Sequence, residues 1–207
     1  EEAFARGKSL HEYLREKAQK LKPGESGLLA LDWWNGNRSI LTDGDLTGLL
    51  LGMTLQTRPE ELYRALIEAT AYGTRILVEN YREHGVPVEE FVAAGGISRK
   101  DPMTMQIYAD VLNTPVQIVG THQGSAFGSA LFGAVAAGRE NGGFSHILEA
   151  AERLGKRGNT VYDPIPEHTA VYDRLYGEYK QLHDCFGRGG SNVMKRLKAL
   201  SREQKQK

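Results

Sequence analysis

The chain is poor in cysteine and carries no excess charge of either sign. Cys185 is the single cysteine among 207 residues, so no internal disulfide can form, and we expect a reducing, cytoplasmic environment. Lys and Arg total 26, as do Asp and Glu, whereas domains that bind nucleic acid are usually basic. The apolar runs are too short to cross a bilayer, and the first residues lack the apolar core of a signal peptide. We therefore expect neither a nucleic-acid nor a membrane partner.

The sequence also lacks the short motifs of the common cofactor sites. It contains no Gly-x-x-x-x-Gly-Lys-Ser/Thr, no Gly-x-Gly-x-x-Gly after a strand, no Cys-x-x-Cys and no His-Glu-x-x-His. Asp32 and Glu68 are carboxylates that could face a cleft, although a structural role is the simpler interpretation of each. The residues by themselves nominate no catalytic group and no metal ligand. The histidines lack metal-ligand spacing and stand at positions 11, 84, 122, 146, 168 and 183.

Apolar strands alternate with helical patterns through the middle of the chain. Such alternation implies crossover connections and a largely parallel sheet. The expected fold class is therefore α/β, with a mostly parallel central sheet flanked by helices. The predicted strands are Leu28–Leu31, Phe91–Ala94 and Val116–Val119, and the predicted helices are Ala3–Leu21, Thr57 to about Gly85, Asp101–Leu112, Ala126–Ala137 and Glu167 to about Phe186.

Composition divides the chain into three regions. Residues 1–27 are predicted to be a leading helix and a turn-rich linker, residues 28–187 the α/β domain, and residues 188–207 a basic tail. A solvated helical extension is the expected structure of such a tail. The chain opens without Met on a predicted helix, so we expect a fragment of a longer protein.

The most informative motif is a pair of glycines between a predicted strand and a predicted helix. Gly95 and Gly96 follow the apolar run Phe91–Ala94. Two glycines allow a tight turn and let the backbone approach a flat ligand or a phosphate closely. The same arrangement often only connects two elements. The turn therefore indicates a candidate nucleotide site, with a plain connection as the alternative.

Several segments together resemble one family, the FGGY carbohydrate kinases, in its C-terminal part. Their order and spacing over residues 28–138 carry the resemblance, and the loop at 32–38 together with the Gly-Gly turn is most similar to members that act on L-ribulose. The segments are the Asp-Trp-Trp-Asn-Gly-Asn-Arg loop at 32–38, the signature-like stretches 48–53 and 61–75, the Gly-Gly-Ile-Ser-Arg-Lys turn at 95–100, the helix 106–112 and the small-residue stretch 125–130.

The resemblance implies a two-domain, actin-like ATPase (ribonuclease H-like) fold that binds ATP in the cleft between its domains. Residues 28–187 would be the C-terminal nucleotide-binding domain, and residues 1–27 the junction with an N-terminal domain. The family's catalytic Asp and most of its sugar contacts belong to that N-terminal domain. The implied activity is transfer of the γ-phosphate of MgATP to L-ribulose. We expect no kinase activity from this chain alone, because phosphoryl transfer needs both walls of the cleft.

The resemblance also implies that the Gly-Gly turn binds ATP. The peptide edge of the turn would lie against the adenine. Lys100 stands where related kinases have an Asn, which leaves the role of that position open. The implied ATP-binding residues are Gly95, Gly96, Ile97, Ser98 and Lys100.

The loop after the first strand supplies the candidate cleft-lining residues. Arg38 could meet a phosphate, and Trp33 could cover an apolar face of a ligand. The alternative is that this loop only packs against the first helix, since Trp is usually core or interface material. The candidates are Asp32, Trp33, Asn35 and Arg38.

Two other functions remain open. The first is an FGGY kinase for another pentulose or a polyol, because the family's sugar contacts lie mostly outside this chain. The second is a non-catalytic nucleotide-binding or oligomerisation module, in which the small-residue helix and the long apolar-faced helix serve assembly. That second function leaves a homodimer open as a further partner.

Overall fold

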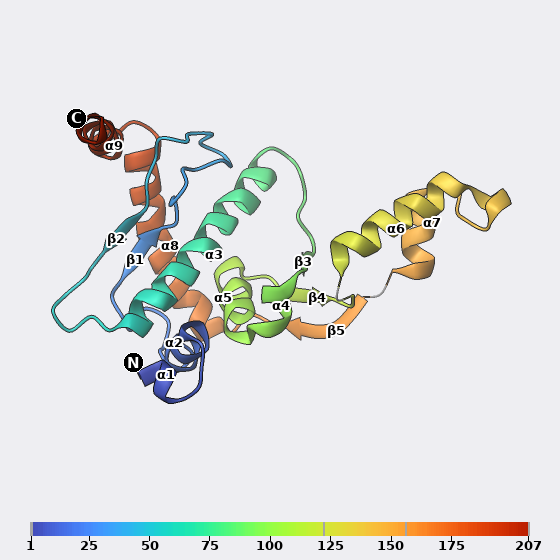
Figure 1. Cartoon of the computed structure of the whole chain (residues 1–207), viewed down its shortest axis with the longest axis horizontal. Helices are drawn as coiled ribbons and strands as arrows, with labels where there is room; N and C mark the ends of the chain where they lie inside the picture. The colour runs from blue at the N-terminus through green and yellow to red at the C-terminus, as the bar shows by residue number, and fades with distance from the viewer. Residues whose placement is uncertain (1, 122, 156, 207) are drawn as a thin grey trace.

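Long helices dominate the molecule, and two small sheets lie against them. The computed structural model describes residues 2–121, 123–155 and 157–206. Figure 1 shows a helical body from which one pair of helices projects as an arm. The helices are α1 (Glu2–Ala5), α2 (Leu10–Ala18), α3 (Pro59–Glu83), α4 (Gly96–Lys100), α5 (Pro102–Leu112), α6 (Gly124–Ala137), a 3-10 turn (Arg139–Asn141), α7 (Ile147–Leu154), α8 (Pro166–Gly187) and α9 (Val193–Lys205).

The α/β class is confirmed, but neither sheet is mostly parallel: one is antiparallel and the other is mixed. β1 (Leu29–Leu31) pairs antiparallel with β2 (Leu49–Leu51), and β3 (Phe91–Ala93) pairs parallel with β4 (Val116–Val119). β5 (Arg157–Tyr162) pairs antiparallel with β4. α5 crosses over from β3 to β4, which makes that pair parallel. α6 and α7 instead lead the chain out and back to the same end of β4, so β5 runs the opposite way.

The prediction of one continuous leading helix is wrong. The chain breaks at Gly7, whose φ is 63°, and α2 begins only after Ser9. The backbone N–H of Glu12 donates to the Ser9 hydroxyl at 3.2 Å, and the Glu12 carboxylate accepts from the backbone N–H of Ser9 at 2.9 Å. This reciprocal pair is a capping box, which marks the beginning of a helix. The capping signal seen inside the predicted helix is therefore the start of α2.

The main core lies between α3, α8 and the first sheet. The ring of Tyr72 in α3 lies 5.3 Å from that of Tyr179 and 6.2 Å from that of Tyr172, both in α8. Leu31 of β1 and Trp33 are buried against the same cluster. Burying aromatic rings in this way supplies much of the apolar surface removed from water on folding. The core therefore fixes α8 against α3 and places the end of β1 beside both.

A buried ionic cluster joins three helices. The guanidinium of Arg64 donates to the Glu68 carboxylate at 2.8 Å, to the Tyr172 hydroxyl at 2.8 Å, and to the carbonyl oxygens of Ala18 and Leu21 at 3.1 and 2.8 Å. The Tyr172 hydroxyl donates in turn to Glu68 at 2.9 Å. Burial raises the pKa of Glu68 above its usual value, although Arg64 opposes that rise. Glu68 thus has the structural role that the sequence favoured.

The basic tail forms a helix, as predicted, and this helix is tethered to a loop of the body. Lys195 Nζ lies 2.5 Å from Asp43 Oδ2, and Arg202 Nη2 lies 3.0 Å from Asp45 Oδ1. These two aspartates stand a few residues after Arg38, in the segment that follows β1. α9 therefore restrains the loop that carries the candidate cleft residues.

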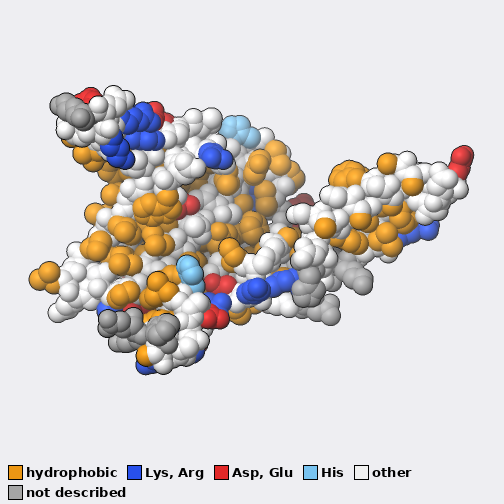
Figure 2. All heavy atoms as spheres, in the orientation of Figure 1, with side chains coloured by type: hydrophobic (Ala, Val, Ile, Leu, Met, Phe, Trp, Pro, Cys, Tyr) orange, Lys and Arg blue, Asp and Glu red, His pale blue; other side chains and the backbone are white. Residues whose placement is uncertain are grey.

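The arm exposes apolar side chains. Phe132 of α6 is 64% exposed and Leu148 of α7 is 68% exposed. Figure 2 shows hydrophobic side chains along this arm, to the right of the helical body. Among the described residues, no helix combines the length and the apolar character that spanning a bilayer requires.

We predict that Arg64→Met strongly destabilises the fold, because it leaves the buried Glu68 carboxylate without its cationic partner. The expected loss is about 3–5 kcal/mol, a fall in Tm of about 2–4 °C for each kcal/mol. Thermal unfolding followed by circular dichroism measures it. The control is Lys8→Met, which breaks a pair whose side chains are 39% and 45% exposed and is expected to cost at most about 1 kcal/mol. Equal shifts in the two variants would contradict a stabilising role for the cluster.

Candidate functional site

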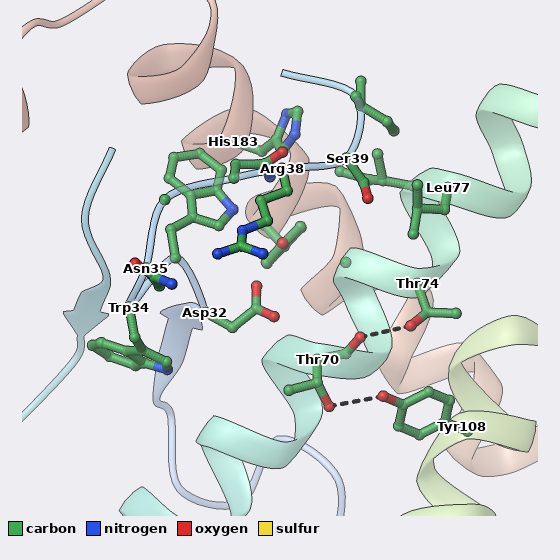
Figure 3. Close-up of a pocket in the computed structure, with 17 residues that line it drawn as sticks. Asp32, Trp34, Asn35, Arg38, Ser39, Thr70, Thr74, Leu77, Tyr108 and His183 are labelled. Carbon is green, nitrogen blue, oxygen red and sulfur yellow. Dashed lines mark hydrogen bonds between the residues drawn. The ribbon is translucent and has the colours of Figure 1, made fainter. Parts of the chain in front are cut away.

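One cavity brings together the four candidate residues of the loop after β1. It has a volume of about 520 Å³ and is lined by this loop, by one face of α3, by α8 and by Tyr108 of α5. Asp32, Trp33, Asn35 and Arg38 all line it. Figure 3 shows the Asp32 carboxyl pointing into the space beneath the Arg38 guanidinium, with Asn35 at the side. These four residues, which are close in sequence, therefore form one wall of the cavity.

The two tryptophans of the loop have different environments. Trp33 is 2% exposed and meets the ring of His183 edge-on at a centroid distance of 5.4 Å. Trp33 packs against α8. The alternative from the sequence, that this loop only packs against the first helix, does not describe Trp33. Trp34 is 59% exposed, and its ring occupies the space beside Gly48, where a Cβ atom would collide with it. Trp34, which the sequence argument did not single out, is therefore the tryptophan that a ligand could reach.

Asp32 is half-buried, and burial raises the pKa of its carboxyl group above the usual value. A hydrogen bond from its own backbone N–H is the opposing effect. Removing a carboxylate from water without a cationic partner disfavours the charged form. The cavity therefore contains a carboxyl group that keeps its proton to a higher pH than an exposed aspartate does.

Two polar side chains on α8 line the cavity, and the sequence argument missed both. Tyr179 and His183 are fully buried, and the structure shows no hydrogen-bond partner for the Tyr179 hydroxyl or for His183 Nε2. Their spacing in α8 is typical of a helix face that packs into the core. The sequence signal that could have identified them is a polar atom on each of two rings of a core-facing helix. Buried polar atoms normally need a hydrogen-bond partner, so such rings are candidates for a site.

The opposite wall of the cavity is formed by hydroxyl groups that already have partners. The Tyr108 hydroxyl donates to Thr70 Oγ1 at 3.0 Å, and Thr70 Oγ1 donates to the carbonyl oxygen of Ile67 at 2.7 Å. Thr74 Oγ1 donates to the carbonyl oxygen of Thr70 at 2.9 Å (Figure 3). The bond from Tyr108 joins α5 to α3, whereas the other two bonds lie within α3.

The Gly-Gly turn lies elsewhere, between β3 and α4. Gly95 has a φ of 101°, which explains the need for glycine at this position, and an added Cβ at Gly95 or Gly96 would meet nothing within 4 Å. Ile97 is 69% exposed and Lys100 is exposed, so the peptide edge of the turn is open. Ser98 is buried, and its hydroxyl donates to the carbonyl oxygen of Gly95 at 2.9 Å. Ser98 thus shapes the turn from inside.

The structure groups the predicted site residues into two places. The turn residues follow β3, and none of them lines the 520 Å³ cavity, which lies next to β1, α3 and α8. Within the described residues, no group of three or more His, Cys, Asp or Glu side chains is arranged to hold a metal ion. His122, one of the scattered histidines, lies outside the described residues.

The chain belongs to a known family. Residues 2–137 match the C-terminal domain of the FGGY family of carbohydrate kinases, and because this is more than half of the chain, the chain belongs to that family. The sequence is similar to that of the ribulokinase of Bacillus licheniformis, with 61% identity over 199 residues. It is 56% identical over 200 residues to the ribulokinase of Halalkalibacterium halodurans.

The chain spans about a third of the length of these relatives. The two alignments cover 96% and 97% of this chain, but only 36% of each relative. Among solved structures, the xylulose kinase of Rhodospirillum rubrum is 30% identical, with a TM-score of 0.69 over 84% of this chain and 33% of that one. The ligand-bound xylulose kinase of Lactobacillus acidophilus has a TM-score of 0.74 over 89% of this chain and 36% of that one, at 20% identity. The actin-like ATPase fold of FGGY sugar kinases is thereby confirmed.

We predict that Asp32→Asn stabilises the protein at neutral pH. Because the pKa of Asp32 is raised in the folded state, its contribution to stability is full below its unfolded pKa of about 4 and is lost as the pH rises through its folded pKa. The neutral amide removes that loss, so Tm should rise by about 2–4 °C at pH 7 and change little near pH 4.

Asp43→Asn is the matched control, because Lys195 lowers the pKa of Asp43 and the sign is reversed. That variant should lower Tm at pH 7 and have a smaller effect in acid. Thermal unfolding at both pH values measures the two effects. If Asp32→Asn lowered Tm at pH 7, the carboxylate would have a stabilising partner and the account of its burial would be wrong.

Proposed function

We propose that this chain is the ATP-binding part of a kinase that transfers the γ-phosphate of MgATP to L-ribulose. The named relatives of highest identity given above are ribulokinases, and each is aligned over nearly the whole chain. The xylulose kinase that shares the fold is 30% identical, so L-ribulose is favoured over another pentulose. We place the enzyme in the cytoplasm, where the exposed, free Cys185 would stay reduced.

The observation that carries this proposal is the open peptide edge at Gly95 and Gly96. Neither glycine has a neighbouring atom where its Cβ would stand, so a flat ring can approach the backbone there. In our proposal this edge forms one side of the adenine site, with Ile97 and Lys100 at its margin. Ser98 supports the site from below through its bond to the Gly95 carbonyl.

The cavity beside β1 has the groups that a phosphate and a sugar require. Arg38 and Asn35 are exposed at its margin, and a guanidinium is well suited to bind phosphate oxygens. Mg²⁺ would arrive with ATP, since this ion binds through substrate phosphates and a small number of carboxylates. The N-terminal domain of the same kinase would close the cleft and supply the base that accepts the proton of the sugar hydroxyl.

We also propose the division of the chain into residues 1–27 at the junction of the domains, residues 28–187 as the nucleotide-binding domain, and residues 188–207 as the tail. The exposed apolar side chains of α6 and α7 favour a second candidate function, assembly with another protein surface. A homodimer is one form that such assembly would take.

We predict that MgATP binds this chain and that Gly96→Val abolishes or strongly weakens binding. The added side chain has open space around it in the protein, so its expected effect is a collision with the ligand and not misfolding. Gly95 is unsuitable for this test because its positive φ makes any side chain strained. Isothermal titration calorimetry measures the affinity.

The control for this test is Gly177→Val, which places the same side chain at another open glycine, in α8. It should bind MgATP as the unchanged protein does. Equal affinities for Gly96→Val and Gly177→Val would remove the turn from the nucleotide site.

We predict that this chain alone does not phosphorylate L-ribulose at a measurable rate, even where it binds MgATP. Phosphoryl transfer requires the donor and the acceptor to be held in line by both walls of the cleft. A coupled assay for ADP formation, with L-ribulose at saturating concentration, measures the rate. Sugar-dependent ADP formation that persists after repeated purification would show that the catalytic base lies within this chain.

A further inference from the structure

Two residues in the loop after β1 have a backbone conformation that their side chains disfavour. Ile40 has a φ of 73° and Thr42 has a φ of 52°. A branched Cβ atom makes this left-handed region costly, and such residues persist only where their surroundings hold them. Among the described residues, Asn113 is the only other non-glycine residue with a positive φ, and asparagine tolerates that region.

These two residues belong to a rim segment, residues 38–45, whose first three residues line the 520 Å³ cavity. Backbone bonds close this segment at Asp43. The N–H of Asn37 donates to the carbonyl oxygen of Asp43 at 2.9 Å, and the N–H of Asp43 donates to the carbonyl oxygen of Asn37 at 2.8 Å. Contacts that hold Asp43 therefore also hold the strained residues that precede it.

Three cations of α9 hold this end of the rim segment. Lys195 Nζ lies 2.5 Å from Asp43 Oδ2. Lys198 Nζ lies 3.2 Å from Asp45 Oδ1, and Arg202 Nη2 lies 3.0 Å from the same oxygen. The three cations are separated by three and four residues, which is the spacing of side chains on one face of a helix. α9 thus presents a row of positive charge to two aspartates of one short segment.

The later turns of α9 are joined to the body by charge. Met194, in the first turn, is 5% exposed and belongs to the main core. Leu197 is 61% exposed and Leu200 is 52% exposed, so these two leucines do not pack the following turns against the body. Lys198 Nζ also donates to the carbonyl oxygen of Gly44 at 2.7 Å. Polar contacts with the rim segment therefore take the place of apolar packing here.

The ion pairs persist at neutral pH but are sensitive to salt. The hydrogen bond from Lys195 lowers the pKa of Asp43, and the hydrogen bond from Lys198 lowers the pKa of Asp45. Both carboxylates therefore stay ionised well below neutral pH. Dissolved ions screen the attraction between exposed charges, so these contacts weaken as the ionic strength rises.

We propose that α9 is an electrostatic latch that holds the strained rim segment in place, so that Lys195, Lys198 and Arg202 position Arg38 at the margin of the cavity. Each exposed pair is weak by itself, but the three act on the same short segment. When the latch opens, the two strained residues return to ordinary backbone angles and the rim segment moves. The inference does not depend on which ligand the cavity binds.

The test is hydrogen–deuterium exchange of the 207-residue chain, followed at the amides of residues 38–46. Raising the NaCl concentration from about 0.1 M to about 1 M shortens the range of electrostatic attraction from about 10 Å to about 3 Å. Exchange at these amides should accelerate about tenfold in the unchanged chain, the combined effect of three weak pairs. The triple variant Lys195→Gln/Lys198→Gln/Arg202→Gln should exchange rapidly at both salt concentrations.

Two further variants separate the effect of charge from other effects of substitution. Lys195→Arg/Lys198→Arg keeps both charges and should retain slow, salt-dependent exchange. Arg196→Gln/Lys205→Gln removes two cations of the same helix that make none of the latch contacts, and it should behave as the unchanged chain does. Glutamine and lysine have similar helix propensities, so α9 should stay helical in the glutamine variants, which circular dichroism checks.

Thr42→Asn tests the strain by itself. Thr42 is exposed, so the substitution loses no packing, and asparagine tolerates the positive φ. The Tm should rise by about 2–4 °C. In the triple variant the same substitution should reduce the acceleration of exchange, because less strain is released when the latch opens.

The two tryptophans of the chain, Trp33 and Trp34, supply an independent readout because both lie in the loop that leads into the rim segment. Quenching of their fluorescence by acrylamide, which is uncharged, should increase in the triple variant and in about 1 M NaCl. Equal exchange in the triple variant and in Arg196→Gln/Lys205→Gln, or a salt dependence that survives in the triple variant, would overturn the latch. MgATP is absent from all of these measurements, so their outcome is separate from that of the ATP-binding test.

Discussion

The buried guanidinium of Arg64 is the constraint on which the arrangement of the helices depends. A charge that is removed from water must have its hydrogen-bond donors satisfied, and Arg64 finds acceptors on three different segments. Glu68 is on its own helix, Tyr172 is on α8, and the carbonyl oxygens of Ala18 and Leu21 belong to the end of α2 and the turn after it. Any displacement of α8 or α2 along α3 would leave part of this charge without partners. The cluster therefore fixes the relative positions of these helices as well as their contact.

The position of the cavity follows from that arrangement. Once α8 is fixed on α3 by Arg64 and by the tyrosine cluster, Tyr179 comes to lie opposite Gly73, about two helical turns beyond the Arg64 contact. β1 ends beside the same pair of helices and places Asp32 over the glycine. The tail helix α9 then restrains the loop that carries Asn35 and Arg38 through its ion pairs with Asp43 and Asp45. Contacts outside the cavity, between the helices and between α9 and the loop, thus position the polar groups that line it.

Local sequence patterns predicted the parts of this structure that local physics determines. The strands at Leu28–Leu31 and Val116–Val119, the glycine turn and the long helix starting near Thr57 each have their own signals in neighbouring residues, and all are present. The loop at 32–38 was also identified as a wall of one site, because its residues are close in sequence.

The sequence could not reveal features that arise from distant contacts. Tyr179 and His183 meet Asp32 across about 150 residues of chain, and their helical spacing is equally typical of core aromatics. The direction of β5 depends on the α6–α7 excursion, whose second helix is short and was not predicted. The leading helix was predicted as continuous because a capping signal can be read as part of a helix unless the break at Gly7 is known.

The central proposal is that the open peptide edge at Gly95 and Gly96 forms one side of an adenine site. Hydrogen–deuterium exchange of the chain with and without MgATP tests this proposal most directly. The proposal predicts that saturating MgATP slows exchange at residues 94–98. Unchanged exchange at residues 94–98 with saturating MgATP would contradict it.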